Sequence, residues 1–298
     1  MLVLTSLSDQ LSQLTYVRKE QMWFENLADN LDVVRAGRDV LAMPHEVKPV
    51  IVLGAGPSYN VKQEEFHRIR RLAFDGKINV FAADKTLESL LENRITPSLT
   101  ASLDGDPVIA KFYSCLKQYN PVGMKICLAS MVHPSVVEAT KDYDRYWFNI
   151  VFDKIDGSDV SISRAVHWMT RKCLTNGLGN VGSWLSFAAV EMEAKPVILI
   201  GIDFSYGVET SPMKTPYWNG FMKQYGGDTK KVIKECFHYE TNSFGNRVLT
   251  DIVFDGYRGL FLEALDRMKT EVINCSPYSI VNGPRVKCML IDEALKQV

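Results

Sequence analysis

The stretch Val50–Asn60, VIVLGAGPSYN, decides the fold of this chain. Four consecutive aliphatic residues run into the glycine pair Gly54 and Gly56, and helix-compatible sequence resumes near Lys62. A continuous apolar run of this kind is typical of a strand buried on both faces of a parallel sheet. Glycines at its carboxyl end permit a tight turn and a close approach of backbone to a ligand. The sequence therefore predicts a site at the carboxyl edge of a parallel sheet, beside a helix N-terminus that suits phosphate.

The turn residues Gly54, Gly56, Pro57 and Ser58 form the first candidate ligand-binding group. Ser58 adds a hydroxyl at the mouth of the turn, and we expect Gly56 to lie where backbone approaches bound phosphate. The alternative is an ordinary tight turn between a strand and a helix. A dinucleotide dehydrogenase would carry a third fingerprint glycine, which this turn lacks, so a nicotinamide enzyme is disfavoured.

Two further predicted strands end in carboxylates. Lys77–Asp84 ends in Asp84, and Ser98–Leu103 is followed by Asp104 and Asp106. Carboxylates beside a phosphate would repel it unless they hold a divalent cation that bridges the two. We therefore expect Asp84, Asp104 and Asp106 to hold Mg²⁺, with Asp84 and Asp104 as catalytic candidates. The alternative is that Asp84 and Asp106 cap the helices that follow them.

A second glycine-rich turn, Asn176–Ser183, opens the predicted helix Trp184–Met192. Its backbone N–H groups would suit a phosphate or a nucleotide ribose, although close helix–sheet packing at its glycines is the alternative. The predicted strand Val197–Ile200 then brings Asp203 to the same edge, where it could orient substrate, ligate metal or brace its loop. The candidate nucleotide-binding residues of this region are Gly179, Asn180, Gly182, Ser183 and Asp203.

The stretch 204–250 interrupts the regular pattern with many aromatic residues among glycines and polar residues. A long insertion beside an active edge is commonly a lid or a subunit contact. Its aromatic rings could stack on a pterin or base, or pack against a sugar. His238 is the histidine here that could act as a general base.

Composition predicts a cytoplasmic globular enzyme. The chain has 298 residues, of which 46% are hydrophobic and 23% charged, and its net charge is −1. This balance gives no electrostatic attraction to nucleic acid or an anionic membrane, and no apolar run is long enough to span one. The six cysteines show no CxxC pair and are expected to be reduced core residues.

Residues 1–47 are predicted to form a helical arm, helical over Ser6–Leu41, that caps the core or forms an oligomer contact. We interpret its Arg18-Lys19-Glu20 run as a solvated face. Residues 48–298 are predicted to be a Rossmann-like α/β domain with a mostly parallel sheet and helices on both faces. Its remaining predicted elements are the helices Glu64–Phe74, Thr86–Asn93, Pro107–Tyr119 and Asp251–Met268, and the strands Lys125–Ala129, Trp147–Phe152 and Glu271–Cys275.

These motifs, in this order, resemble the 6-hydroxymethylpterin diphosphokinase MptE-like domain, over roughly Lys48 to Val286. The same domain forms the core of the Maf proteins, the motility-associated factors implicated in flagellin glycosylation. The long insertion after Asp203 departs from the generally shorter pterin enzymes. Two of the matching segments, Gly179–Gly182 and the strand end at Asp203, look more like the Maf proteins and the bacterial sialyltransferases than like the pterin enzymes. The segments that carry the resemblance are Gly54–Ser58, Ala82–Asp84, Ile95–Pro97, Leu103–Gly105, Gly179–Gly182, Val197–Asp203, Asn246–Asp251, Val272–Cys275 and Asn282–Gly283.

The resemblance and the residues leave three hypotheses. The first is an ATP-dependent diphosphokinase that acts on a 6-hydroxymethyl pterin, with Mg²⁺ placed by Asp84, Asp104 and Asp106. The second is a glycosyltransferase that uses a CMP-sugar or another nucleotide sugar, held by Gly179–Ser183 and Asp203, with His238 as base and a sugar as acceptor. The third is a non-catalytic nucleotide-binding scaffold. A kinase with a Walker loop is excluded because GxxxxGK[ST] does not occur.

Overall fold

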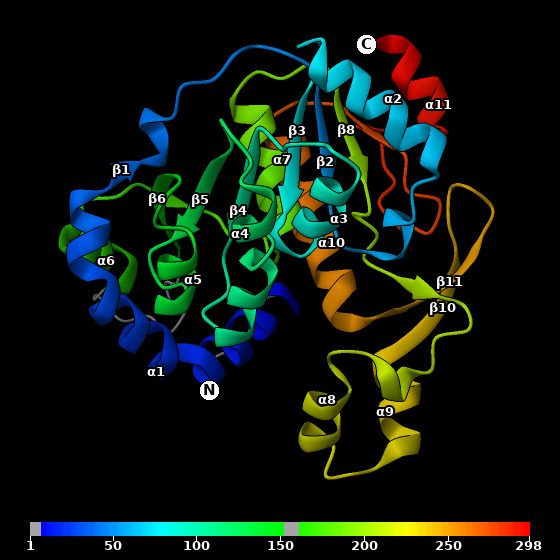
Figure 1. Cartoon of the computed structure of the whole chain (residues 1–298). Coiled ribbons are helices and arrows are strands. Elements are labelled where there is room, and N and C mark those ends of the chain that lie inside the picture. The colour runs from blue at the N-terminus through cyan, green and yellow to red at the C-terminus, as the bar shows by residue number, and fades with distance from the viewer. Residues whose placement is uncertain (1–6, 152–160) are drawn as a thin grey trace.

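One large parallel sheet organises the molecule (Figure 1). The computed structural model describes the backbone of residues 7–151 and 161–298 and the side chains of residues 19–151 and 161–298. The predicted α/β, Rossmann-like fold is confirmed, because every strand pair in the large sheet is parallel. Across the sheet the strands are β1 (Arg38–Asp39), β6 (Asp144–Ile150), β5 (Lys125–Ala129), β4 (Leu99–Ser102), β3 (Asn79–Ala83), β2 (Val50–Leu53), β8 (Val197–Ile200), β12 (Val272–Asn274) and β13 (Val286–Cys288), while β7 (Leu174–Thr175) pairs with β6.

The first four residues of the stretch Val50–Asn60 form the central strand β2. Its residues are fully buried and alternate between the two faces of the sheet. Val50 and Val52 pack toward one hydrophobic core, and Ile51 and Leu53 pack toward the other. The chain order reverses here, because β3 to β6 lie on one side of β2 and β8 and β12 lie on the other. Such a switch point is where open α/β sheets bind ligands, outside the carboxyl ends of the strands.

Helices cover both faces of the sheet, as predicted. The core on the Ile51 side includes residues of α2 (Gln63–Phe74) and α11 (Ile291–Ala294). The core on the Val50 side includes residues of α1, α5, α6, α7 and α10. The bounds of these and the remaining α-helices are α1 Leu7–Ala36, α3 Leu87–Glu92, α4 Leu116–Tyr119, α5 Pro134–Ala139, α6 Ile162–Thr170, α7 Val181–Glu191, α8 Trp218–Gln224, α9 Thr229–Cys236 and α10 Ile252–Arg267.

Three predicted elements differ from those observed. The predicted helix Pro107–Tyr119 is a 3₁₀ segment, Pro107–Tyr113, followed by the single turn α4. The strand predicted at Trp147–Phe152 begins earlier, at Asp144, and Phe152 lies outside the described residues. The predicted helix Ser6–Leu41 ends at Ala36, before Gly37, and Ser6 also lies outside the described residues.

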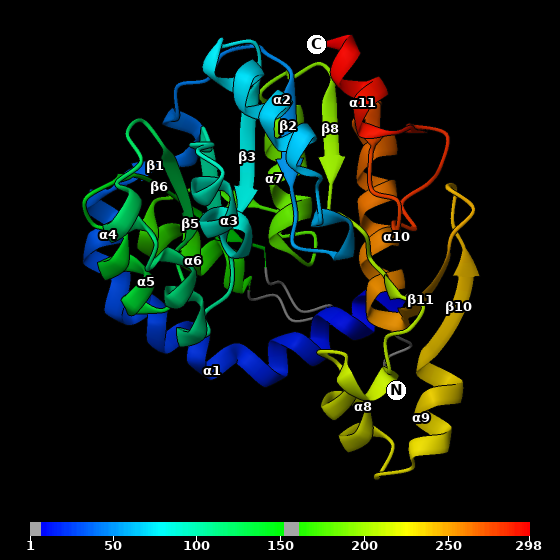
Figure 2. The ribbon, with the colours of Figure 1, turned by 45° about the vertical axis from the view of Figure 1, so that its right-hand side comes forward.

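The N-terminal helix α1 lies across the carboxyl ends of the strands. Figure 2 shows it crossing beneath the sheet, from the α6 side toward α10. It contacts α5, α6 and α10, so it is packed on the core as the sequence predicted. Its position places α1 at the edge where the candidate site was expected, while its predicted role in an oligomer remains a prediction.

The insertion forms a small lobe with its own sheet (Figure 2). Its strands are β9 (Tyr206–Gly207), β10 (Phe237–Thr241) and β11 (Arg247–Asp251), antiparallel in the order β10-β11-β9. Several of its aromatic rings pack on one another in a separate hydrophobic cluster that includes Phe221 and Phe237. These rings stabilise the lobe and are therefore not an open stacking surface.

The six cysteines all lie in the described residues and are free, as predicted. Among the described residues, we find no helix whose length and hydropathy would let it cross a membrane.

Replacement of Gly201 tests the contact between β2 and β8. Gly201 has φ +72°, and a Cβ there would lie 2.3 Å from the carbonyl oxygen of Gly54. We expect Gly201→Ala to lower the free energy of unfolding by more than about 3 kcal/mol, measured by urea denaturation. Gly123→Ala is the matched control, because Gly123 has φ +80° but open space around the added carbon; it should lose only about 1 kcal/mol. Equal losses of unfolding free energy in the two variants would show that the positive φ angle, and not the contact with Gly54, causes the destabilisation.

Candidate functional site

The carboxyl ends of β2 and β8 lie in direct backbone contact. The N–H of Gly54 donates to the carbonyl of Ile200 at 2.8 Å, and the N–H of Gly56 donates to Gly201 at 2.9 Å. A Cβ on Gly54 would lie 2.5 Å from the Gly201 oxygen. The glycines at the switch point are therefore required first by this contact between two loops.

Ser58 and Asp203 form a buried clasp across the same junction. The backbone N–H of Ser58 donates to Asp203 Oδ2 at 2.9 Å, and its hydroxyl donates to Oδ1. The N–H of Tyr278 in turn donates to the Ser58 hydroxyl at 2.9 Å. A Cβ on Gly56 would lie 2.2 Å from Asp203 Oδ2. The tight approach predicted at Gly56 thus exists, but the group approached in this structure is Asp203 and the Ser58 hydroxyl is already bonded.

Burial changes the acidity of Asp203. Its side chain is 2% exposed, and desolvation raises its pKa to about 6, although the hydrogen bonds from Ser58 act in the opposite direction. Of the three roles predicted for Asp203, the geometry matches the one that braces the loop.

The helix after the first turn has an acidic start. Pro57–Tyr59 forms a short 3₁₀ turn, and α2 begins only at Gln63. Its first turn contains Glu64 and Glu65, and the Glu65 carboxylate accepts the Lys62 N–H at 2.7 Å. Because two carboxylates there repel an anion, this N-terminus is poorly suited to phosphate.

Asp84 lies buried at the end of β3. Its carboxylate accepts the Ser102 hydroxyl and, at 2.7 Å, the backbone N–H of Lys85. The Ser102 oxygen also lies 3.0 Å from the Tyr113 hydroxyl. Desolvation raises the pKa of Asp84 to about 6, and the charge of Asp104 acts in the same direction. A carboxyl group with this pKa, at a strand end, can exchange a proton near neutral pH.

Asp104 forms an ion pair with Lys19, which we expected from the sequence to lie on a solvated face of the N-terminal helix. Lys19 Nζ of α1 lies 2.8 Å and 2.7 Å from the two carboxylate oxygens of Asp104. The interpretation of Lys19 as part of a merely solvated run is wrong, because α1 crosses this edge. Asp106 caps the following 3₁₀ segment through the Val108 N–H at 2.9 Å, which matches the alternative foreseen for it.

The second glycine-rich turn leads into α7. The Asn180 side chain accepts the Ser183 N–H at 2.9 Å and caps the helix. Gly179, with φ +82°, fits against the ring of Tyr257, and Gly182 fits against Ile202. The first turn of α7 is made of uncharged residues, so this N-terminus suits an anion better than that of α2 does.

Residues from distant parts of the chain meet at the carboxyl edge. The charge of Asp104 helps to raise the pKa of Tyr217 and of Tyr257, for which burial is the main cause. Tyr217 belongs to the insertion and Tyr257 to α10, and both pack against the hydrophobic cluster of the insertion. The structure therefore brings the insertion, α10 and the second glycine turn together.

Two cavities flank the loop after β2. One, of about 370 Å³, is lined by residues that include Tyr59, Phe66, Lys85 and Ser89. The other, of about 460 Å³, lies between this loop and the insertion and includes Glu209 and Tyr278. Both volumes fall in the range of small-molecule sites. Lys85 directly follows Asp84, so the first cavity adjoins the carboxylate end of β3.

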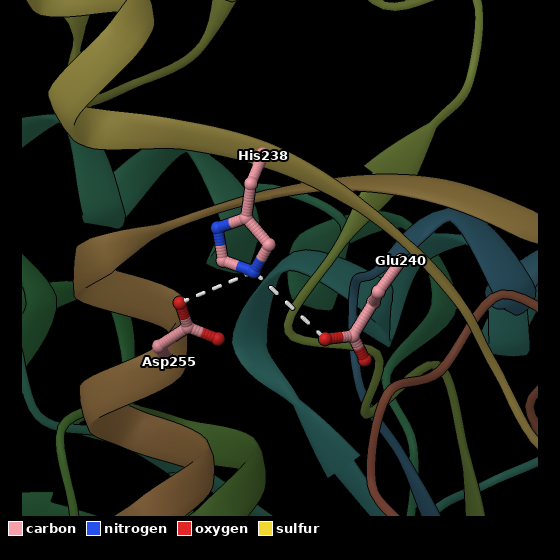
Figure 3. A group of neighbouring side chains, drawn as sticks. All are labelled: His238, Glu240 and Asp255. Atoms are coloured by element: carbon pink, nitrogen blue, oxygen red, sulfur yellow. Dashed lines mark ion pairs between the residues drawn. The ribbon is translucent and has the colours of Figure 1, made fainter.

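His238 lies in an ionic cluster on the insertion and α10 (Figure 3). Its Nε2 lies 3.6 Å from Asp255 and 3.9 Å from Glu240, and Arg258 bonds both of these carboxylates. Among the described residues, these three side chains form the one group of three whose metal-type ligand atoms lie within 4.8 Å of one another. Asp84, Asp104 and Asp106 do not form such a group, and their role as Mg²⁺ ligands stays a prediction.

Comparisons with known proteins agree with this fold. The model of the 6-hydroxymethylpterin diphosphokinase MptE-like family matches residues 21–209, more than half of the chain. The chain belongs to this family. The solved structure of the Maf glycosyltransferase from Magnetospirillum magneticum AMB-1 is similar, with a TM-score of 0.61 and 15% identity. The similarity covers 91% of this chain but 40% of that one. The comparison with curated proteins gave no match.

Sequence reasoning placed the candidate site at the carboxyl edge, which stays a prediction, but it missed several side chains that lie at this edge. Lys19, Ser102 and Tyr257 come from segments without a motif, and only the packing of α1 and α10 brings the first and the last of these to the site. Lys85 stood beside a predicted carboxylate and could have been noticed from that position alone.

The clasp predicts a pH-dependent effect of Ser58→Ala. Loss of a hydrogen bond to a buried carboxylate should lower the free energy of unfolding by about 1.5–3 kcal/mol at pH 7.5. The loss should be smaller at pH 5, where Asp203 is protonated. Chemical denaturation at both pH values measures it, and Ser114→Ala, which removes an exposed hydroxyl bond, should change little. A loss that is the same at both pH values would contradict the clasp.

Asp84→Asn tests the raised pKa at the end of β3. The folded state keeps the Asp84 proton up to about pH 6, whereas the unfolded chain loses it near pH 3.8. The free energy of unfolding of the natural chain therefore falls as pH rises through this window, and Asn removes that fall. The stability of the variant minus that of the natural chain should increase by roughly 2–3 kcal/mol from pH 4 to pH 7. Parallel pH curves would contradict the raised pKa.

Proposed function

We propose that this protein is a nucleotide-dependent transferase and, more specifically, a Mg²⁺-ATP-dependent diphosphokinase that acts on a 6-hydroxymethyl pterin. The observation that carries the proposal is the pair of carboxylates, Asp84 and Asp104, at the ends of neighbouring strands. The charge of Asp104 contributes to the raised pKa of Asp84, and Lys85, the residue after Asp84, lines a cavity of ligand size. Membership of the MptE-like family supports the same class of reaction.

The carboxylates fit Mg²⁺ as a partial ligand set. Mg²⁺ is commonly held by one or two carboxylates together with waters and substrate phosphates, so a third protein ligand is not needed. Asp104 is 39% exposed in its side chain and can reach an incoming ion, and Asp84 is the second candidate. When bound, Mg²⁺ would neutralise charge on the phosphates during transfer. Asp106 is better described as a cap than as a ligand.

The protein's own groups would position the reactants. The cavity beside Tyr59 and Lys85 would accept the nucleoside, and the uncharged start of α7 would face the phosphates. In the transfer, the acceptor hydroxyl oxygen forms a bond to the β-phosphorus of ATP, the bond from that phosphorus to the α–β bridging oxygen breaks, and AMP leaves. With Asp104 as the carboxylate that would hold the ion, Asp84 is the candidate to take the hydroxyl proton.

A glycosyltransferase that uses a CMP-sugar or another nucleotide sugar is the second candidate. The fold likeness to the Maf glycosyltransferase over 91% of this chain favours it. In a glycosyltransferase, the second glycine-rich turn, which contains Asn180, would hold the nucleotide. His238 would have to leave its cluster with Glu240 and Asp255 to act as a base on a sugar acceptor.

Ligand-dependent melting separates the two candidates. The melting temperature would be measured with ATP, CMP and CTP, each with and without Mg²⁺, because a ligand that binds only the native state raises it. A Mg²⁺-dependent rise with ATP, together with release of AMP when a 6-hydroxymethyl pterin is added, supports the diphosphokinase. A rise with CMP and CTP but not with ATP supports the glycosyltransferase. No rise with any of them would contradict both.

Replacement of Asp104 tests its proposed contact with the cation. We expect Asp104→Asn to weaken Mg²⁺-dependent ATP binding at least about tenfold, since a charged ligand to the ion is lost. Asp106→Asn is the matched control and should stay within about threefold of the natural chain, because Asp106 only caps a turn. Calorimetric titration with and without Mg²⁺ measures both. Equal effects of the two variants would make Asp104 a loop brace.

A further inference from the structure

Helix α1 is attached to the carboxyl edge by a stripe of side chains on one face. Lys19, Trp23, Asn26 and Asn30 recur at spacings of three or four residues, which places them on the same side of the helix. Asn26 Nδ2 donates to the carbonyls of Gly105 at 2.9 Å and Met131 at 3.1 Å. Asn30 Nδ2 donates to Ser130 at 3.3 Å and Val132 at 2.7 Å. Both amides are buried, so they fix α1 over the loops after β4 and β5.

The ion pair at the end of this stripe is partly exposed. The side chain of Lys19 is 28% exposed and that of Asp104 is 39% exposed. A solvent-exposed ion pair adds little to stability, whereas the buried amide bonds hold the helix in place. The pair is therefore not needed to dock α1, and a ligand can reach both of its members.

The negative charge of the aspartates at this edge means that a bound nucleotide would need a positively charged group near its phosphates. Asp84, Asp104, Asp203 and Asp251 all lie at strand ends or the helix start beside them, and together they repel an anionic nucleotide. Arg258 of α10 is bonded to Glu240 and Asp255. An ammonium group that points at Asp104 can instead turn one of its three N–H donors to a phosphate oxygen.

We propose that Lys19 is a phosphate-binding residue of the site, and that Asp104 is its partner when no nucleotide is bound. With a nucleotide bound, Asp104 would hold Mg²⁺ and Lys19 would bond a phosphate oxygen. Lys19 lies before the residues that the family model matches, so the family comparison does not assign it a role. This inference rests on the proposed function, because it assumes a phosphate-containing substrate at this edge.

The test is binding of inorganic pyrophosphate without Mg²⁺, measured by calorimetry. We expect Lys19→Met to weaken it about tenfold, since a charge-assisted hydrogen bond is lost. We expect Asp104→Asn to tighten it, because the variant removes a repelling charge and frees Lys19. Lys141→Met is the matched control: it breaks the 2.6 Å pair with Glu138 near the end of α5 and should leave binding unchanged. Circular dichroism and a melting temperature within about 4 °C of the natural chain check the fold.

Opposite effects of Lys19→Met and Asp104→Asn would support the proposal. Effects of the same sign, or natural affinity in Lys19→Met, would overturn it and leave Lys19 as a structural partner of Asp104. In that case Mg²⁺-ATP would still bind the natural chain, and the proposed function would stand. Absence of binding of both pyrophosphate and Mg²⁺-ATP to the natural chain would overturn the proposed function together with this inference.

Discussion

The contact between the carboxyl ends of β2 and β8 is the constraint on which the rest of this structure depends. The two strands are neighbours at the switch point of the sheet, and their loops approach until the added carbon of an alanine would meet a backbone oxygen. Ser58 and Asp203 close the junction with two hydrogen bonds, and Tyr278 joins from the loop after β12. The three loops are thereby held in one arrangement, and the two cavities lie on either side of the loop that contains residues 57–60.

This contact gives a structural reason for the glycines at positions 54 and 56. A glycine pair after a buried strand suggests a cradle for phosphate, but at Gly56 the missing side chain makes room for the Asp203 carboxylate. The groups left for an anionic ligand lie further along the edge, at Lys19 beside Asp104, at the start of α7 and at Lys85. The buried carboxyl group of Asp84, with its pKa near 6, lies next to them and gives the edge a proton acceptor suited to neutral pH.

The N-terminal helix lies against the carboxyl edge of the sheet. Two buried asparagines bind α1 to loops that follow β4 and β5, and the same face of the helix presents Lys19 to Asp104. An arm that composition alone describes as an accessory is thus part of the carboxyl edge. The insertion is joined to the main domain as well, since its aromatic rings build a core of their own on which Tyr257 of α10 also packs.

The sequence by itself determined the parallel α/β fold and the strand-end positions of Asp84, Asp104 and Asp203, because buried strands and glycine turns leave local patterns. Only the tertiary structure decided what each of these side chains contacts. Asp203 meets Ser58 across 145 residues and Asp104 meets Lys19 across 85, and no local pattern records such pairs. A carboxylate at a strand end has the same sequence signature whether it binds a metal, caps a turn or bonds a lysine, and packing of distant elements selects among these roles.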